Sequence, residues 1–428
     1  MTANSASVRP GRSPGADRSP PALDRLSPEA ELVVRCATTR PAGRDGRVDG
    51  LVAVGPDWEQ VVEVASANGV APLVLRQLDA RALDLPEEAR SSLRRSSRQT
   101  SIRAMHLADE LRTILDDLDH AGVSALPFKG PTLALASYGD LALRPFRDLD
   151  LLVPRAGLSR AVDRLQSLGY EWTVDAPRLD DSAVLGGPFT RPLAAEFRLH
   201  RGPATVELRP RVGSPSRPLD LAFEGLWERR ETVRLAEHPV PALSPEDRLL
   251  VLAYHGVKHR WDRLKWICDV AETTRAADGL EWGTLLERAR ASGARRKLCV
   301  ALALADALFD AAVPAWVLLE ARSDPRAVAL ADEAVEAFST DPLDTPEMRA
   351  PVRYNALACD STLAAMGTVL RAPWFHPSLA EYRLRPLRGV LHPLYYPLRP
   401  VRASAVLASS AFGGLRDRLH WPSSSRGR

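Results

Sequence analysis

The sequence predicts an α+β fold, in which a small group of strands in the middle of the 428-residue chain is flanked by helices on both sides. Three observations lead to this prediction. A helical pattern runs from Pro86 to His120, with no Gly and no further Pro. Short apolar or alternating runs bounded by turn residues follow between residues 125 and 209, and these are typical of strands. Helical patterns then return between Pro245 and Ala337.

These patterns divide the chain into five segments. They are a leader over residues 1–27, an N-terminal helical region over 28–121, a strand-containing core over 122–240, a helical domain over 241–338 and a C-terminal segment over 339–428. The leader is rich in Pro, Ser, Gly and Arg without an apolar core, so we expect disorder and not a signal peptide. The C-terminal segment starts with a Pro-rich linker and then mixes Tyr with Arg. Such a mixture can bind nucleic acid or a membrane surface, but docking on the protein's own core, with a disordered end, is preferred.

The composition, 45% hydrophobic and 26% charged, is that of an ordinary soluble protein with two or three domains. Its four cysteines are far apart and predict neither a zinc site nor disulfides. The most apolar stretch, Leu298 to Leu319, is interrupted by Asp and Pro, so we expect a buried helix, no transmembrane segment and a cytoplasmic protein. The net charge of +3 does not require a nucleic-acid partner. Only four of the 57 basic residues are lysines, so Lys129 stands out.

In the N-terminal region, Ser27 followed by a proline predicts a capped helix start. Two more helices are predicted at Trp58 to Ala67 and at Pro72 to Leu78. The long helix that ends at His120 carries a series of apolar positions toward its end. They are Ile102, Met105, Leu111, Ile114 and Leu118. We expect these positions to face the core.

The core begins with an apolar run over residues 125–128 that ends in Lys129 and Gly130. This pattern predicts a strand that turns into a short helix from Thr132 to Tyr138. Backbone N–H groups at such a turn are where proteins hold phosphate, and Lys129 adds a positive charge there.

Asp148 and Asp150 stand at the start of a second apolar run that ends at Val153. If this run is a strand, its period of two puts both carboxylates on one face and Leu149 on the other. Adjacent carboxylates repel each other, so the pair indicates a cation, and oxygen ligands suit Mg²⁺, with Mn²⁺ as an alternative. The simpler interpretation is two solvated aspartates at a strand start.

The rest of the core predicts a helix from Leu158 to Leu168, a strand from Tyr170 to Val174 and a loop over residues 175–192. Two alternating runs then flank a turn with Gly and Pro. They span Glu196 to His200 and Ala204 to Arg209, and they predict an antiparallel hairpin.

The helical domain opens with a capping box at Ser244. His255 and His259 are four residues apart and share a helix face. A zinc-protease helix needs Glu directly after the first His; Gly256 stands there, so that interpretation is rejected.

Together these motifs resemble a poorly characterised family of bacterial nucleotidyltransferases within the polymerase-β-like superfamily. The matches over about fifty residues are Phe128-Lys129-Gly130, Leu133, Tyr138-Gly139-Asp140, Arg144-Pro145, Asp148 to Val153, and Leu165 to Gly169-Tyr170. Weaker matches are Trp58, Gly69 to Leu73, and Leu391 to Pro400. The resemblance implies a polymerase-β-type core, a small mixed sheet with helices, as the catalytic domain.

The resemblance implies that Asp148, Asp150 and Glu207 are catalytic residues and metal ligands, with Glu207 as a third carboxylate on a neighbouring strand. An exposed structural charge is the alternative for Glu207. Lys129, Gly130 and Arg144 would bind the triphosphate. The sequence departs from these patterns twice: Lys129-Gly130 stands where the wider superfamily usually carries Gly-Ser, and Arg209 stands where many members of the narrower family carry His.

In the same family a helix pair follows the core, and this chain matches it from His255 to Asp269. The resemblance implies that several of its side chains face the cleft, with Lys258 and His259 as the preferred nucleotide contacts. The others are His255, Arg263 and Asp269. The alternative is that this block, including its tryptophans and Leu264, is plain core.

The implied activity is Mg²⁺-dependent transfer of an NMP group from an NTP, with ATP among the candidates, to an acceptor with release of pyrophosphate. A small molecule or a protein is the expected acceptor, and the modest charge argues against RNA. Two alternatives remain. One is a non-catalytic nucleotide-binding partner with the same fold, and the other is hydrolysis or kinase chemistry on a phosphorylated small molecule.

Overall fold

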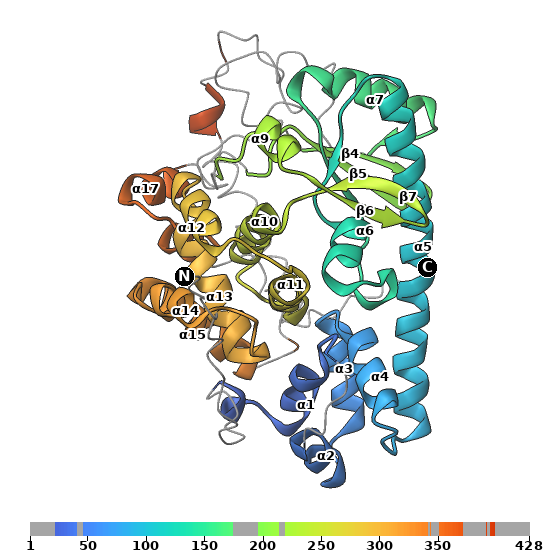
Figure 1. Ribbon diagram of the computed structural model, residues 1–428, viewed down its shortest axis with the longest axis vertical. Coiled ribbons are helices and arrows are strands. Elements are labelled where there is room, and N and C mark those ends of the chain that lie inside the picture. The colour runs from blue at the N-terminus through green and yellow to red at the C-terminus, as the bar shows by residue number, and fades with distance from the viewer. Residues whose placement is uncertain are drawn as a thin grey trace, which may run out of the picture.

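A computed structural model describes most of the chain. The described residues are 22–40, 46–173, 196–213, 219–340, 343, 351–370, 391 and 394–398. They form a helix-rich α+β structure with a small mixed sheet, as predicted. Figure 1 shows the sheet next to the long helix α5, with α10 and α11 between the sheet and the remaining C-terminal helices.

Five α-helices are described in the N-terminal region. They are α1 (Pro28–Cys36), α2 (Gly46–Ala53), α3 (Trp58–Ala67), α4 (Ala71–Ala80) and α5 (Glu87–His120). The predicted cap is confirmed, because the Ser27 side chain accepts a hydrogen bond from the backbone N–H of Ala30. The leader prediction falls mainly outside the described residues, but Leu23–Arg25 form a 3₁₀ turn and Leu23 is buried.

The apolar face of α5 is only partly the predicted one. Leu111, Ile114 and Leu118 are buried, whereas Ile102 and Met105 are 63% and 68% exposed. Ala104 and Leu107 face the core in their place. Ile102 lies about 200° around the helix from Ala104, so both cannot point inward.

The sheet has the order β1-β2-β5-β4-β3, and among its described strands only the neighbours β2 and β5 run parallel. Its strands are β1 (Leu126–Pro127), β2 (Leu149–Leu152), β3 (Glu171–Trp172), β4 (Phe197–Arg201) and β5 (Ala204–Arg209). The predicted hairpin of β4 and β5 is therefore confirmed. The predicted loop over 175–192 lies outside the described residues.

Helical segments connect these strands. They are α6 (Gly130–Leu133), a π-helical turn (Ala134–Tyr138), 3₁₀ turns at Leu141–Leu143 and Arg155–Gly157, and α7 (Leu158–Ser167). Leu149, Leu151 and Val206 pack in one core with α5 and α7. Because strand side chains alternate, the intervening residues of β2 and β5 point to the opposite face, which is where the predicted carboxylates lie.

A second hairpin was not predicted. After α9 (Phe223–Glu228), β6 (Glu231–Leu235) pairs with β7 (His238–Ala242), which packs near β1 and α6. Pro239 and Pro241 stand inside β7, and proline argues against a strand unless that strand is at an edge. In a two-stranded sheet such as β6–β7, each strand has one edge without a strand partner, so β7 can contain proline.

Eight helices are described after this hairpin. They are α10 (Pro245–Lys258), α11 (Leu264–Ala276), α12 (Trp282–Ala291), α13 (Arg295–Phe309), α14 (Ala315–Arg322), α15 (Pro325–Thr340), α16 (Pro351–Leu357) and α17 (Thr362–Leu370). The predicted cap at Ser244 is confirmed. The expected single buried helix over 298–319 is instead two helices, because Asp310 ends α13 in a left-handed conformation. No helix within the described residues is long and apolar enough to cross a membrane.

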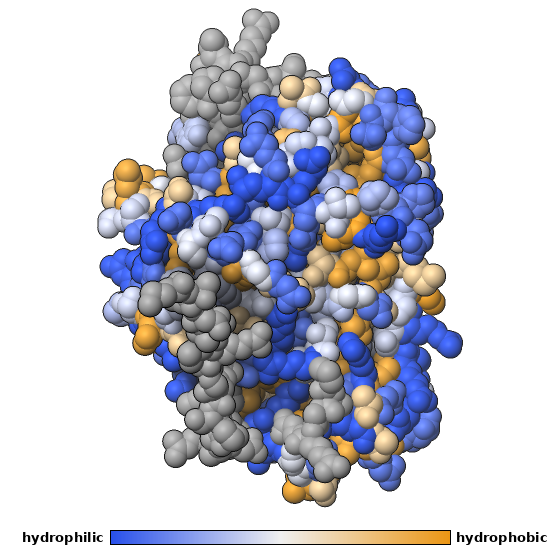
Figure 2. All heavy atoms as spheres, in the orientation of Figure 1, coloured by the Kyte–Doolittle hydropathy of each residue, from blue (hydrophilic) through white to orange (hydrophobic). Residues whose placement is uncertain are grey.

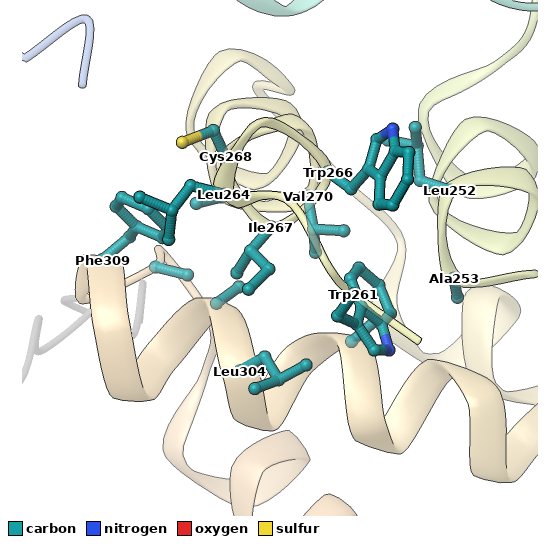
Figure 3. Packing of buried hydrophobic residues seen from close by; sticks show 14 of the residues in the cluster. Leu252, Ala253, Trp261, Leu264, Trp266, Ile267, Cys268, Val270, Leu304 and Phe309 are labelled. Atoms are coloured by element: carbon teal, nitrogen blue, oxygen red, sulfur yellow. The ribbon is translucent and has the colours of Figure 1, made fainter. Parts of the chain in front are cut away.

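The second core joins α1 to α4 with α10 to α15, so the two helical regions share one interior. Figure 3 shows Trp261, Leu264 and Ile267 packing beside Leu304 and Phe309 of α13. Apolar side chains also remain exposed on α17, where Figure 2 shows hydrophobic atoms at the margin of the molecule. The C-terminal docking prediction falls largely outside the described residues, although Tyr395 is buried.

Candidate active site

The predicted carboxylates meet on the face of the sheet that points away from α5. In the parallel pairing of β2 with β5, Asp150 lies directly beside Glu207. Asp148 immediately precedes β2 and is close enough to both carboxylates for their charges to raise its pKa. Burial is the largest cause of that rise, and Lys129 only partly opposes it. The three residues named from sequence therefore form one acidic site.

Lys129 is the cation that contacts Asp150. Its Nζ lies 2.8 Å from Asp150 Oδ2, and both side chains are largely buried. Gly130 follows in a left-handed conformation with φ of 61°, and a Cβ there would lie 3.3 Å from the carbonyl oxygen of Asp148. Glycine at this position lets the turn approach the carboxylate strand closely.

Asp150 has one oxygen with unused hydrogen-bonding capacity. Oδ1 is buried and accepts no hydrogen bond from any described residue. Arg209 Nε lies 3.6 Å from this oxygen, beyond hydrogen-bond distance. A buried carboxylate oxygen without a donor is costly, so this oxygen is suited to a cation or a donor from a ligand.

Glu207 is held by two arginines. Arg198 Nε donates to Oε1 at 3.0 Å, and Arg209 Nη2 donates to Oε2 at 2.5 Å. Arg209 Nη2 also pairs with Glu196 Oε2 at 2.5 Å. Burial acts to raise the pKa of Glu207, but Arg209 and Arg198 outweigh it and lower this pKa to about 2.

This arrangement differs from the expected metal triad. Within the described parts of the chain, no three His, Cys, Asp or Glu side chains are placed to hold a metal ion together. Glu207 has cationic partners on both oxygens, and sequence reasoning did not anticipate Arg198 or Glu196. The cross-strand register of β4 and β5, which places Arg198 opposite Glu207, was the available signal.

The opposite wall of the site comes from α10 and α11. His255, His259 and Trp266 form a group of rings, with centroids 4.7 Å apart for the two histidines and for His259 with Trp266. Burial, and then the charge of Lys129, lower the pKa of His255 well below its usual value, so its ring is neutral at neutral pH. The predicted shared face of the two histidines is confirmed.

Three of the four lysines of the chain surround this site. Lys258 ends α10, and its charge acts on both Glu196 and His255. Lys265 lies on α11, and its charge acts on Asp148 and His255. Burial, with Arg144 next, lowers the pKa of Lys265 to about 8. Lys265 was not named as a site residue, although its rarity as a lysine was a signal.

Arg144 occupies a different environment from the expected triphosphate contact. It is buried, and its Nε and Nη2 donate to the two carboxylate oxygens of Asp269 at 2.6 and 2.8 Å. Tyr138 donates to the same carboxylate at 2.7 Å. These three residues, which we call the Asp269 cluster, join the core to α11. Arg144 and Asp269, both expected at the cleft, are thus fully engaged with each other.

The turn between α10 and α11 explains Gly256. A Cβ on Gly256 would overlap the Trp261 ring, which packs on the glycine. Arg260 and Trp261 both have positive φ, 57° and 58°, so the turn holds two residues in a conformation that side chains rarely adopt. Trp261 and Leu264 are buried, as the core interpretation anticipated, while Arg263 immediately precedes α11 and its side chain makes no capping hydrogen bond.

Comparison with known proteins is consistent with this geometry. A model of the family described as uncharacterised nucleotidyltransferase matches residues 55–310, a range that includes the carboxylates, the lysines and the Asp269 cluster. A search of curated proteins found no match, and a search of solved structures found none either.

Proposed function

The chain belongs to this nucleotidyltransferase family, and from that membership we propose that its site transfers an NMP group from an NTP to a small-molecule or protein acceptor. The pyrophosphate would leave, and the core would be of the polymerase-β type. The observation that carries the proposal is the in-register pairing of Asp150 with Glu207, beside Asp148, with Lys129 in contact with Asp150 and the charges of Lys258 and Lys265 acting on the same acidic group. Acidic and cationic groups are thereby combined at one place, as phosphoryl transfer requires.

The site fits a divalent ion at two of the three predicted ligands. Asp150 Oδ1 is a buried oxygen with no described donor, and burial, followed by the charges of Asp150 and Glu207, raises the pKa of Asp148. Mg²⁺ or Mn²⁺ would be held by Asp148 and Asp150, and when bound it would neutralise phosphate charge. Glu207 is already neutralised by arginines and is considered separately below.

The lysines and the ring group are suited to the nucleotide. Lys129, Lys258 and Lys265 would act as positive charges for the triphosphate, with the Gly130 turn beside them. His259 and Trp266 present two aromatic rings at 37° to each other next to these lysines, and the π-face of either ring is a surface against which a base could pack. This assignment keeps Lys258 and His259 as nucleotide contacts and adds Lys265.

The acidic groups supply the proton chemistry. Burial and the neighbouring carboxylates raise the pKa of Asp148, which favours this carboxylate as the group that takes a proton from an acceptor hydroxyl. The deprotonated oxygen would attack the α-phosphorus in line, and the bond to the β-phosphate oxygen would break. Positioning and charge neutralisation would supply most of the acceleration.

One observation favours a second candidate function. Both oxygens of Glu207 are paired with arginines, so the full set of three acidic ligands is not available in this conformation. A nucleotide-binding protein that does not turn over needs fewer acidic ligands. The second candidate is therefore a non-catalytic partner that binds an NTP through the same lysines.

The test is a titration of each of the four NTPs with Mg²⁺ into wild type, Asp150→Asn and the control Asp109→Asn, on the exposed side of α5. We expect wild type and the control to bind one NTP only with metal, and Asp150→Asn to bind at least about tenfold more weakly. Pyrophosphate release with candidate acceptors separates transfer from binding alone. Release of orthophosphate or a nucleoside diphosphate would indicate hydrolysis or kinase chemistry, and absence of NTP binding to wild type would refute both candidates.

A further inference from the structure

We infer that Arg209 serves as a fixed cation between Asp150, Glu196 and Glu207, in the place where a second metal ion would lie, so that the site takes a single divalent ion. The inference rests on the proposed function, because it concerns the same acidic site. It assigns to Arg209 a positioning and charge-balancing role and removes Glu207 from the set of metal ligands.

The contacts of Arg209 carry this inference. Its Nη2 lies 2.5 Å from Glu207 Oε2 and 2.5 Å from Glu196 Oε2, and its Nε lies 3.6 Å from Asp150 Oδ1. These three carboxylates come from β2, from β5 and from the residue before β4. One guanidinium group therefore bridges carboxylates that would otherwise repel one another or require an ion.

The burial of Arg209 makes its charge a permanent part of the site. Its side chain is 14% exposed, and the side chains of Glu207 and Asp150 are 7% and 1% exposed. A guanidinium cannot dissociate as a bound ion does, so the charge is present whatever the metal concentration.

Arg198 is a matched comparison for this role. It also contacts Glu207 and Glu196 and carries the same charge, but its side chain is 48% exposed. It approaches Glu207 from β4, and its ion-pair partners among the described residues are Glu196 and Glu207. Loss of Arg198 thus removes one positive charge without opening the space between Asp150 and Glu207.

The test counts Mn²⁺ ions bound per chain, without nucleotide, by the EPR signal of free Mn²⁺. We expect Arg209→Gln to bind one more ion than wild type, or to bind Mn²⁺ at least about tenfold more tightly. Arg198→Gln should resemble wild type. Equal ion counts and affinities in wild type and Arg209→Gln would overturn the inference, as would an equal gain in both variants, since that would reflect net charge alone.

A second variant guards against misfolding. Arg209→His is smaller and neutral, and its imidazole can ligate Mn²⁺, so it should also gain an ion. Circular dichroism shows which of the two Arg209 variants is folded. A folded variant that binds no additional Mn²⁺ ion, and binds Mn²⁺ no more tightly than wild type, refutes the inference. Titration of NTPs into wild type with Mn²⁺ tests the proposed function separately. NTP binding with no gain in Arg209→Gln or Arg209→His means that only the inference fails.

Discussion

Lysine is the rarer basic residue of this chain, and its distribution is informative. Of the four lysines, Lys129, Lys258 and Lys265 lie near the carboxylates, whereas Lys297 of α13 donates to the backbone carbonyl of Gly293, just before that helix. The arginines near the site are paired with carboxylates in fixed geometries. Lysine carries a compact charge on a flexible stem, so it can follow a phosphate group that changes position.

The lowered pKa of Lys265 predicts a pH dependence of nucleotide binding. A bound triphosphate favours charged lysine, so binding above the pKa of about 8 must take up a proton. From about pH 7.5 to about pH 9 the affinity of wild type should fall by up to about tenfold, because each pH unit above a pKa leaves about a tenth as much charged group. Isothermal titration of the preferred NTP at several pH values measures this slope.

The control for this prediction is Lys265→Gln. Lys265→Gln should bind the NTP more weakly at neutral pH. Its affinity should change less between about pH 7.5 and about pH 9, since the triphosphate is already almost fully ionised at the start of this range. His255 does not contribute to the slope, because its pKa lies well below its usual value. If NTP affinity falls equally steeply with pH in wild type and in Lys265→Gln, the pH dependence does not come from Lys265, and its assignment as a triphosphate contact is contradicted.

At the scale of elements, the α10–α11 turn depends on one close contact. The Trp261 ring packs on Gly256, so Gly256→Ala must move the ring or the helix. Overpacking of this kind reduces the free energy of unfolding by about 1–3 kcal/mol. Urea denaturation of Gly256→Ala measures the loss.

The same substitution in a Trp261→Leu background separates this contact from helix propensity. With the ring removed, Gly256→Ala should cost nothing and can stabilise α10, because alanine is the better helix former. A double-mutant cycle would thus show a coupling of about 1–3 kcal/mol between the two positions. An equal cost in both backgrounds would show that the ring contact is not responsible.

Much of this element structure could be predicted from the sequence. The helices capped by Ser27 and Ser244 and the β4–β5 hairpin follow from local patterns. The grouping of Asp148, Asp150 and Glu207 follows from strand periodicity combined with family resemblance. The β6–β7 hairpin could not be predicted, because its prolines argue against a strand until its edge position is known.

The partners of the charged side chains could not be predicted for another reason. Arg144 was expected to bind phosphate, but its partner Asp269 is 125 residues away in the sequence. Arg209 and Glu207 are neighbours on one strand, yet their pairing depends on side-chain reach and on Glu196. Local patterns show which residues are charged, and only the packing of distant elements decides which charges neutralise each other.

At the scale of the whole molecule, the Asp269 cluster joins the sheet half to the helical half. Arg144 and Tyr138 come from the connection between β1 and β2, and Asp269 comes from α11. Ser137 and Thr273 extend the junction with a hydrogen bond of 2.8 Å. Because Lys258, Lys265 and the ring group lie on α10 and α11, this junction sets their distance from the carboxylates.

Asp269→Asn should therefore weaken both the fold and the site. The neutral side chain leaves the buried Arg144 charge uncompensated, and removal of one partner of a buried pair costs about 3–5 kcal/mol of unfolding free energy. The exposed pair on α5 offers the control, since Asp116→Asn should cost less than about 1 kcal/mol. Denaturation in urea compares the two variants, and NTP titration shows whether folded Asp269→Asn also binds more weakly.

A double variant shows whether the cost comes from the unpaired charge. Replacing both partners by apolar residues of similar size, Arg144→Met with Asp269→Leu, removes the uncompensated charge and should be less destabilising than Asp269→Asn alone. NTP affinity should remain low in the double variant, because the directional bonds that fix α11 against the core are gone. If the double variant regains wild-type affinity, apolar packing alone positions the lysines, and the Asp269 cluster contributes to stability without aligning the site.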